Sequence, residues 1–180
     1  MEELNKKVVQ MIKYCLVDGS NIAFIIPKWK NNKKFGRFNL LEKIETFLNK
    51  LISDYPSLEF DIIVDANLKY KIDNLALLQT AIEENRIKMC PAGSTADEFI
   101  REMLEEKEGG VAIISNDLFR QFPKPLQDKR AEWRFPVMFL NESVIIPSLK
   151  ERILSNNVIS KEKVIDQMRI ETEELNIKSY

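Results

Sequence analysis

The chain has 180 residues, of which 44% are hydrophobic and 31% charged, a composition typical of a globular domain large enough to bury a core. Its 27 basic and 28 acidic side chains give a net charge of −1, so any binding to nucleic acid would need a local basic patch. The absence of histidine excludes serine–histidine and cysteine–histidine catalysis and most zinc chemistry, and leaves carboxylates and a metal for any hydrolysis. No apolar run reaches the roughly 20 residues that span a bilayer, and the N-terminus is charged. We therefore expect a cytoplasmic protein without membrane contact.

Apolar runs alternate with helical patterns along the chain, which is typical of a mainly parallel sheet covered by helices. The apolar runs predict four strands, at Tyr14–Val17, Phe60–Val64, Ile87–Met89 and Val111–Ser115. The segments between them predict three helices: Asn39–Ile52 capped by Asn39, a second capped by Asp73, and a third from Ser94 or Thr95 to about Lys107. Cys15 and Cys90 each lie in or beside an apolar run, so we expect buried thiols rather than a disulfide or redox pair.

The last third of the chain has a less regular pattern. Pro123–Arg134 contains two prolines and several charges and predicts a loop or a broken helix. Pro136–Leu140 and Val144–Ile146 form either a last strand or a small hairpin. We therefore expect one α/β domain over residues 1–147 and a helical C-terminal extension over 148–180, which either packs on the domain or contacts another protein.

Acidic side chains stand at equivalent places in this layout. Asp18, Asp65 and Asp117 each follow a predicted strand, and parallel strands bring their carboxyl ends to one edge of a sheet, where ligands bind in open α/β folds. Asp97 and Glu98 begin a helix on the same side. Taken singly, each acid is equally well explained as a loop residue or a helix cap. Their coincidence at one edge favours a site for Mg²⁺ or Mn²⁺, because clustered carboxylates repel one another unless a hard cation intervenes.

Three segments in order resemble one family: Val17–Ala23 (VDGSNIA), Gly93–Ile100 (GSTADEFI) and Ile114–Arg120 (ISNDLFR). Each is weak alone, but together they are similar to the NYN domains of the PIN-like nuclease superfamily, specifically the Regnase-type ribonucleases, over roughly Lys13 to Leu140. The resemblance implies a Rossmann-like, three-layer α/β domain. It also implies an endoribonuclease with an acidic pocket that holds Mg²⁺ or Mn²⁺.

The resemblance also assigns roles to single residues. Asp18 would be the central metal ligand, and Asn21 would orient a ligand, a water or a phosphate. Asp97 and Asp117 would complete the metal site, directly or through water. Glu98 stands where relatives often have a second aspartate, and Asp65 holds a strand-end position that is acidic in some relatives, so both are further candidate metal ligands. The expected supporting residues, which shape the loops, are Gly19, Ser20, Ser115 and Asn116.

A basic loop lies between the first strand and the first helix. Residues 27–37 hold five cations and no acid, together with Trp29 and Phe35. Such a loop predicts RNA contact, because cations neutralise phosphates while aromatic rings stack on unpaired bases. A solvated loop, with Trp29 packed on the domain, is the alternative. Lys69, Tyr70 and Lys71 would extend this RNA-binding surface. Arg120 either binds a phosphate or forms a structural salt bridge. The full set of expected RNA-binding residues is Lys28, Trp29, Lys30, Lys33, Lys34, Arg37 and Arg120.

The sequence thus predicts a divalent-metal-dependent endoribonuclease that acts on single-stranded or looped RNA. Glu98 keeps open a catalytically degenerate module that binds RNA without cleaving it. A small-molecule phosphohydrolase is the other alternative, although Gly19 and Ser20 after Asp18 leave no Asp-x-Asp nucleophile motif. Related nuclease domains often self-associate, which leaves a homodimer open.

Overall fold

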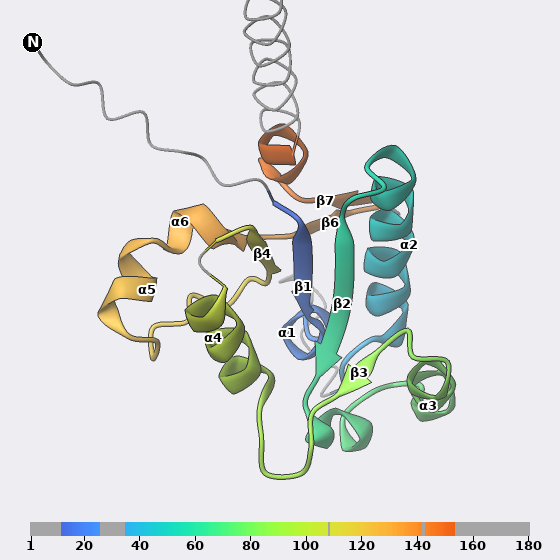
Figure 1. The fold of residues 1–180 in the computed structure, drawn as a ribbon. Helices are drawn as coiled ribbons and strands as arrows, with labels where there is room; N and C mark the ends of the chain where they lie inside the picture. The colour runs from blue at the N-terminus through green and yellow to red at the C-terminus, as the bar shows by residue number, and fades with distance from the viewer. Residues whose placement is uncertain (1–11, 26–34, 108, 142, 154–180) are drawn as a thin grey trace, which may run out of the picture.

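The core of the fold is a sheet of five parallel strands, seen in a computed structural model that describes residues 12–25, 35–107, 109–141 and 143–153 (Figure 1). The strand order is β3-β2-β1-β4-β5, so the first strand lies at the centre. Tyr14 of β1 pairs with Glu59 of β2 on one side and with Val111 of β4 on the other. The strands are β1 (Tyr14–Asp18), β2 (Glu59–Val64), β3 (Lys88–Met89), β4 (Val111–Ile114) and β5 (Arg134–Phe135).

Helices follow most of the strands, as expected for a Rossmann-like domain. Figure 1 shows α2 and α3 at one side of β1 and β2, and α4, α5 and α6 at the other. The helices are α1 (Gly19–Ala23), α2 (Phe38–Asp54), α3 (Leu75–Glu83), α4 (Ala96–Glu106), α5 (Lys124–Asp128) and α6 (Arg130–Trp133), with a 3₁₀ helix η1 (Ala66–Tyr70) after β2. The broken helix expected after the fourth strand is confirmed by α5 and α6.

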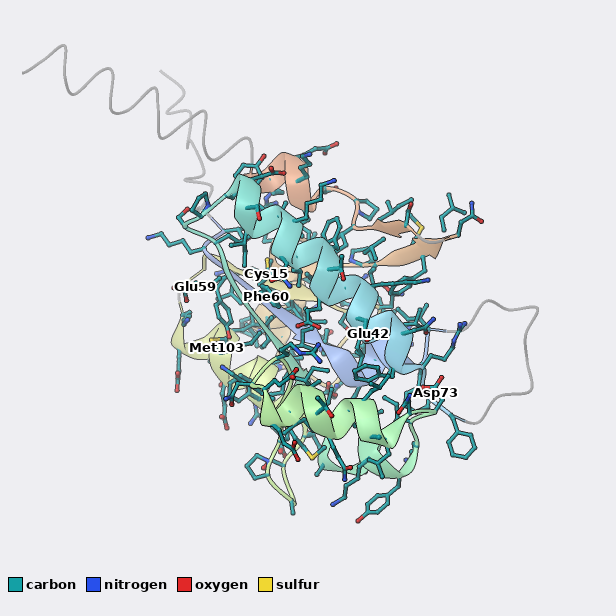
Figure 2. All side chains as sticks on the ribbon, turned by 90° about the vertical axis from the view of Figure 1, so that its right-hand side faces the viewer. Cys15, Glu42, Glu59, Phe60, Asp73 and Met103 are labelled. Carbon is teal, nitrogen blue, oxygen red and sulfur yellow. The ribbon has the colours of Figure 1, made fainter. Side chains whose placement is uncertain are left out.

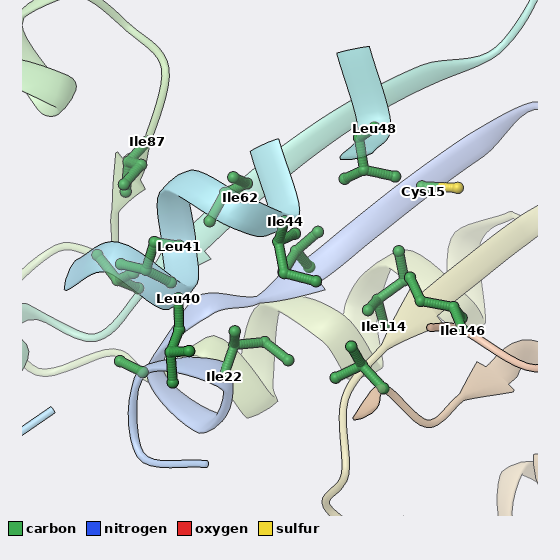
Figure 3. Packing of buried hydrophobic residues seen from close by; sticks show 14 of the residues in the cluster. Cys15, Ile22, Leu40, Leu41, Ile44, Leu48, Ile62, Ile87, Ile114 and Ile146 are labelled. Atoms are coloured by element: carbon green, nitrogen blue, oxygen red, sulfur yellow. The ribbon is translucent and has the colours of Figure 1, made fainter. Parts of the chain in front are cut away.

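The two faces of the sheet pack into separate apolar clusters, which makes the domain three-layered. Successive residues of β1 alternate between them: Cys15 and Val17 lie in the cluster under α2, and Leu16 lies in the cluster under α4 and α6. Figure 3 shows Cys15 and Ile114 of the sheet facing the α2 side chains Ile44 and Leu48. Because both faces are covered, the inner strands contain continuous buried apolar runs, namely Cys15–Val17 of β1, Ile62–Val64 of β2 and the whole of β4. Cys15 and Cys90 are both free thiols and buried.

The helix caps differ from the expected ones. Helix α2 begins at Phe38, one residue before the expected cap Asn39, and the backbone N–H of Phe38 donates to Asp73 Oδ1 at 2.8 Å. Asn74, not Asp73, caps α3 by accepting from the N–H of Leu77 at 3.1 Å. Both predicted caps were therefore wrong. Asp73 instead ties the start of α2 to the segment before α3, and Figure 2 places it beside that end of the helix.

The chain after α6 forms one more sheet strand and then a hairpin. Arg134–Phe135 adds β5 to the sheet, where a strand was expected only from residue 136 onward. Strands β6 (Met138–Leu140) and β7 (Ser143–Ile145) then pair antiparallel, which confirms the hairpin and excludes the single last strand. Residues 149–153 are helical, and Leu149 and Ile153 are buried in the α2-side cluster. Residues 154–180 of the predicted extension lie outside the described residues. Across the described ranges, no helix is long and apolar enough to cross a membrane.

Candidate active site

Asp18 is the centre of the site, at the junction of β1 and α1. Its Oδ1 accepts from the N–H of Asn21 at 3.0 Å, so the residue caps α1, and its Oδ2 accepts from Ser115 Oγ at 2.9 Å. The side chain is 4% exposed. Gly19 allows this sharp strand-to-helix turn, because a Cβ there would lie 2.7 Å from Val64 Cγ1 and 2.9 Å from the carbonyl oxygen of Ile63. The capping aspartate is thereby held at the carboxyl end of the central strand.

The electrostatic environment of Asp18 is unfavourable for its charge. The pKa of Asp18 is raised to about 6, first by burial and then by the carboxylates of Asp97 and Asp65, against the two hydrogen bonds that lower it. Burial also raises the pKa of Asp97, followed by the repulsion from Asp117. Acids from β1, the end of β2, the start of α4 and the end of β4 therefore interact with one another at one edge of the sheet.

Ser115 links the end of β1 to the turn after β4, because its hydroxyl contacts both Asp18 and Asp117. Its hydroxyl donates to Asp18 Oδ2 and accepts the N–H of Asp117 at 3.0 Å. Asp117 Oδ1 in turn accepts the N–H of Phe119 at 2.6 Å. Phe119 is fully buried with φ +45°, a left-handed conformation that a non-glycine residue holds only when its packing fixes it. The tight turn after β4 therefore fixes the carboxylate of Asp117.

Asn21 and Asn116 connect three loops at the same edge. Asn21 Oδ1 accepts the N–H of Asn116 at 2.9 Å. The side-chain amide of Asn116 pairs with Val137 in both directions, donating to its carbonyl at 2.9 Å and accepting its N–H at 2.8 Å. Among the described residues, Asn21 Nδ2 has no protein partner, so this nitrogen is the atom of Asn21 that remains for the expected ligand contact.

Asp65 and Glu98 both have structural partners. The N–H of Asp65 donates to Ser20 Oγ at 2.8 Å, and Asp65 Oδ1 accepts the N–H of Ala96 at 2.7 Å, at the start of α4. Glu98 forms a capping box with Thr95: Glu98 Oε2 accepts the N–H of Thr95 at 3.0 Å, and Thr95 Oγ1 accepts the N–H of Glu98 at 3.2 Å. Glu98 thus serves the helix end, and its role as a metal ligand stays a prediction.

Two residues near the acids were not foreseen. Gln121 Nε2 donates to Asp97 Oδ2 at 2.6 Å and orients that carboxylate. Cys90 follows β3, where burial first, and then Asp65 and Asp18, raise its pKa to about 11. The thiol is therefore protonated at neutral pH and offers no thiolate nucleophile.

The acids supply the oxygen donors that hard cations prefer. A bound cation would stabilise the charged form of Asp18 and so offset the burial that raises its pKa. Within the ranges that the structure describes, no three acidic or cysteine side chains are placed so that they could hold a metal ion by themselves. The donor set therefore fits a cation bound by one or two carboxylates with water as the remaining ligands, the usual arrangement for Mg²⁺.

Two of the predicted RNA-binding residues, Arg37 and Arg120, lie within the described ranges. Lys28, Trp29, Lys30, Lys33 and Lys34 lie outside the described residues. Arg37 is partly exposed, and its N–H donates to the carbonyl of Ala23 at 2.7 Å. Arg120 is exposed on the loop after Asp117. No ion pair between described residues involves Arg120, so the structural salt bridge weighed for it is not seen there.

The sheet order and the two covered faces define the class of fold, a three-layer, Rossmann-like α/β domain with a mainly parallel sheet. Two solved structures share it. The crystal structure of nuclear proteinaceous RNase P 2 from A. thaliana matches with a TM-score of 0.56 and 16% identity, over 74% of this chain and 29% of that one. A second structure, Arabidopsis thaliana nuclear protein-only RNase P 2, matches with a TM-score of 0.53 and 15% identity, over 73% and 29%.

The chain thus spans less than a third of the length of the two structures. At this level of identity the likeness shows the fold. No protein-family model matches the chain, and no curated protein matches it in sequence.

Proposed function

We propose that the chain is a divalent-metal-dependent endoribonuclease of the Regnase type, which hydrolyses phosphodiester bonds in single-stranded or looped RNA. The observation that carries the proposal is the electrostatic coupling of Asp18 with Asp97 and Asp65, and of Asp97 with Asp117, at the carboxyl edge of the sheet. The fold shared with two solved RNase P structures supports it. The lack of histidine supports it further, because it leaves carboxylates as the hydrolytic groups.

Mg²⁺ or Mn²⁺ would be held by one or two carboxylates of the set Asp18, Asp97 and Asp117 directly and by the rest through water, with Asp65 and Glu98 beside them. When bound, the ion would polarise the phosphodiester and lower the pKa of the attacking water.

The chain's own residues orient these groups. Ser115 and the N–H of Asn21 fix both oxygens of the Asp18 carboxylate, and Gln121 fixes Asp97. Burial of Asp18 excludes bulk water from its carboxylate, which strengthens its electrostatic interactions. Arg37 and Arg120 are the described cations that we assign to RNA phosphates.

The test is cleavage of an unstructured RNA in Mg²⁺ or Mn²⁺ by the wild type, Asp18→Asn and Asp117→Asn. We expect each substitution to reduce the rate by more than the roughly 10- to 100-fold that loss of an outer partner of a metal ligand costs. The matched control is Asp54→Asn, because Asp54 is an exposed acid at the end of α2, and it should cleave like the wild type. Cleavage that survives both substitutions and excess EDTA would rule the proposal out.

Two observations favour a second candidate, an RNA-binding module without catalysis. Glu98 is engaged in a capping box, and no three acids of the described chain are placed to hold a metal together. Such a module would bind the same RNA and leave it intact even in Mn²⁺. A gel assay that records binding and cleavage on one substrate separates the two candidates.

A further inference from the structure

Three exposed aromatic side chains stand on three separate segments that meet around Gly36. Phe24 follows α1, Phe35 precedes α2, and Tyr70 ends η1. Their exposed fractions are 38%, 52% and 73%. A single exposed aromatic residue needs no explanation, but several gathered on one surface indicate a binding site.

The backbone around Gly36 holds these segments together. Gly36 forms an isolated parallel bridge with Ile72: its N–H donates to the carbonyl of Lys71 at 2.6 Å, and its carbonyl accepts the N–H of Asp73 at 2.9 Å. A Cβ on Gly36 would lie 3.3 Å from Cζ of Phe24, so the Phe24 ring packs against this glycine. Phe35 is its chain neighbour, and Tyr70 stands two residues before its bridge partner. The surface is therefore fixed by backbone contacts before any ligand arrives.

The same surface carries positive charge. Lys69 Nζ lies 4.9 Å from the centroid of the Tyr70 ring, in a cation–π contact, and Lys71 is exposed beside it. Arg37 follows Gly36 and is partly exposed. The chain as a whole has a net charge of −1, so this grouping of cations is local. Aromatic rings next to cations are the combination that binds single-stranded nucleic acid, since the rings stack on bases and the cations neutralise phosphates.

The surface also adjoins the candidate active site. Helix α1 begins directly after Asp18 and ends just before Phe24, and five helical residues rise only about 8 Å. The helix η1 begins directly after Asp65 and ends at Tyr70. Both connections leave the same edge of the sheet, because β1 and β2 are parallel neighbours (Figure 1).

We propose that Phe24, Phe35 and Tyr70 form a base-stacking platform that, with Lys69, Lys71 and Arg37, holds single-stranded RNA beside the carboxylates. The choice of RNA rests on the proposed function. The platform is a property of this chain's own exposed side chains, and its test is binding, which is measured without cleavage.

The experiment measures the affinity of the full chain for a labelled oligouridine strand by fluorescence anisotropy, in EDTA so that no strand is cut. We expect Tyr70→Ala and Phe35→Ala each to weaken binding about 5- to 100-fold, the loss that follows removal of one stacked base contact. Tyr70→Phe keeps the ring and should bind within about twofold of the wild type. Met138→Ala is the matched control, because Met138 is as exposed as Phe35 but lies on the β6–β7 hairpin, and it should also bind like the wild type.

A second probe, a ribose-phosphate strand without bases, separates stacking from charge. It should bind the wild type, Tyr70→Ala and Phe35→Ala equally, since it offers nothing to stack. The platform is overturned if the wild type does not bind oligouridine, or if the two alanine variants bind it like the wild type. It is also overturned if the variants lose as much affinity for the base-free strand as for oligouridine. The nuclease proposal can fail separately. If the wild type binds RNA through Tyr70 and Phe35 but does not cleave it, the platform is supported and the ribonuclease activity is ruled out.

Discussion

Asp18 lowers the free energy of unfolding by an amount that depends on pH. Its pKa is raised from 3.8 to about 6 in the folded protein, chiefly by burial, so the folded state holds this proton more tightly than the unfolded state. As the pH rises, the unfolded chain loses the proton first. The free energy of unfolding should therefore fall between about pH 4 and pH 6 and level off above that. The loss from this one group is on the order of 3 kcal/mol, at about 1.4 kcal/mol for each pKa unit.

We therefore predict that Asp18→Asn stabilises the protein in EDTA at pH 7, with a melting temperature higher by about 6 to 12 °C for a chain of this size. Asparagine still accepts from Asn21 with its oxygen and can donate to the Ser115 hydroxyl with its nitrogen. The difference should vanish below about pH 3, where Asp18 is protonated in both states. Melting curves from about pH 3 to pH 8 test this, with Asp54→Asn as a variant expected to follow the wild type. A variant less stable than the wild type at every pH would contradict the prediction.

The positions of the acids directly after predicted strands are enough to predict most of the acidic site. Asp18, Asp65 and Asp117 follow buried strands, and parallel pairing brings such positions to one edge. The Thr95-x-x-Glu98 spacing was also present in the sequence as a capping-box signature, and it would have indicated the structural role of Glu98. Gln121 had no such signal, because its contact with Asp97 depends on how the loop after β4 folds back over α4.

Among the elements, the first long helix and the segment before α3 depend on each other. Asp73 accepts from the first N–H of α2, and its own N–H donates to Gly36. We predict that Asp73→Ala lowers stability by about 1 kcal/mol, the usual cost of losing a cap, and speeds hydrogen exchange at Phe38. Asn74→Ala should cost a similar amount but speed exchange at Leu77 at the start of α3. Faster exchange at Leu77 in Asp73→Ala, with Phe38 unchanged, would contradict this assignment of the caps.

The elements that sequence patterns missed are the short ones. Helix α1 has five residues and β5 has two, and neither is long enough to show the periodicity that distinguishes a helix from a strand. Their structure comes from tertiary contacts: α1 is set by the cap of Asp18, and β5 by pairing with the edge of β4. The long helix and the buried strands could be predicted because their apolar residues recur over many positions.

For the whole molecule, the proposed metal links activity to stability. Any ligand that binds only the folded state stabilises it, by about 2.7 kcal/mol at a hundred times its dissociation constant. We predict that Mg²⁺ or Mn²⁺ in such excess raises the melting temperature at pH 7 by about 5 to 10 °C and that EDTA reverses the shift. Asp97→Asn and Asp117→Asn should reduce the shift, whereas Asp54→Asn should keep it. An unchanged melting temperature of the wild type in both Mg²⁺ and Mn²⁺ would contradict the metal assignment.

The central place of β1 in the sheet affects how the chain folds as it is made. β1 and β2 leave the ribosome early, but β4, which covers the other edge of β1, follows about 50 residues after β2. At roughly 5 to 20 residues per second, that edge waits some 3 to 10 s for its partner. The unpaired edge of a largely apolar strand is a template for pairing with other chains. The nascent protein should therefore be most prone to aggregation, and most in need of a chaperone, while residues 65–110 are being synthesised.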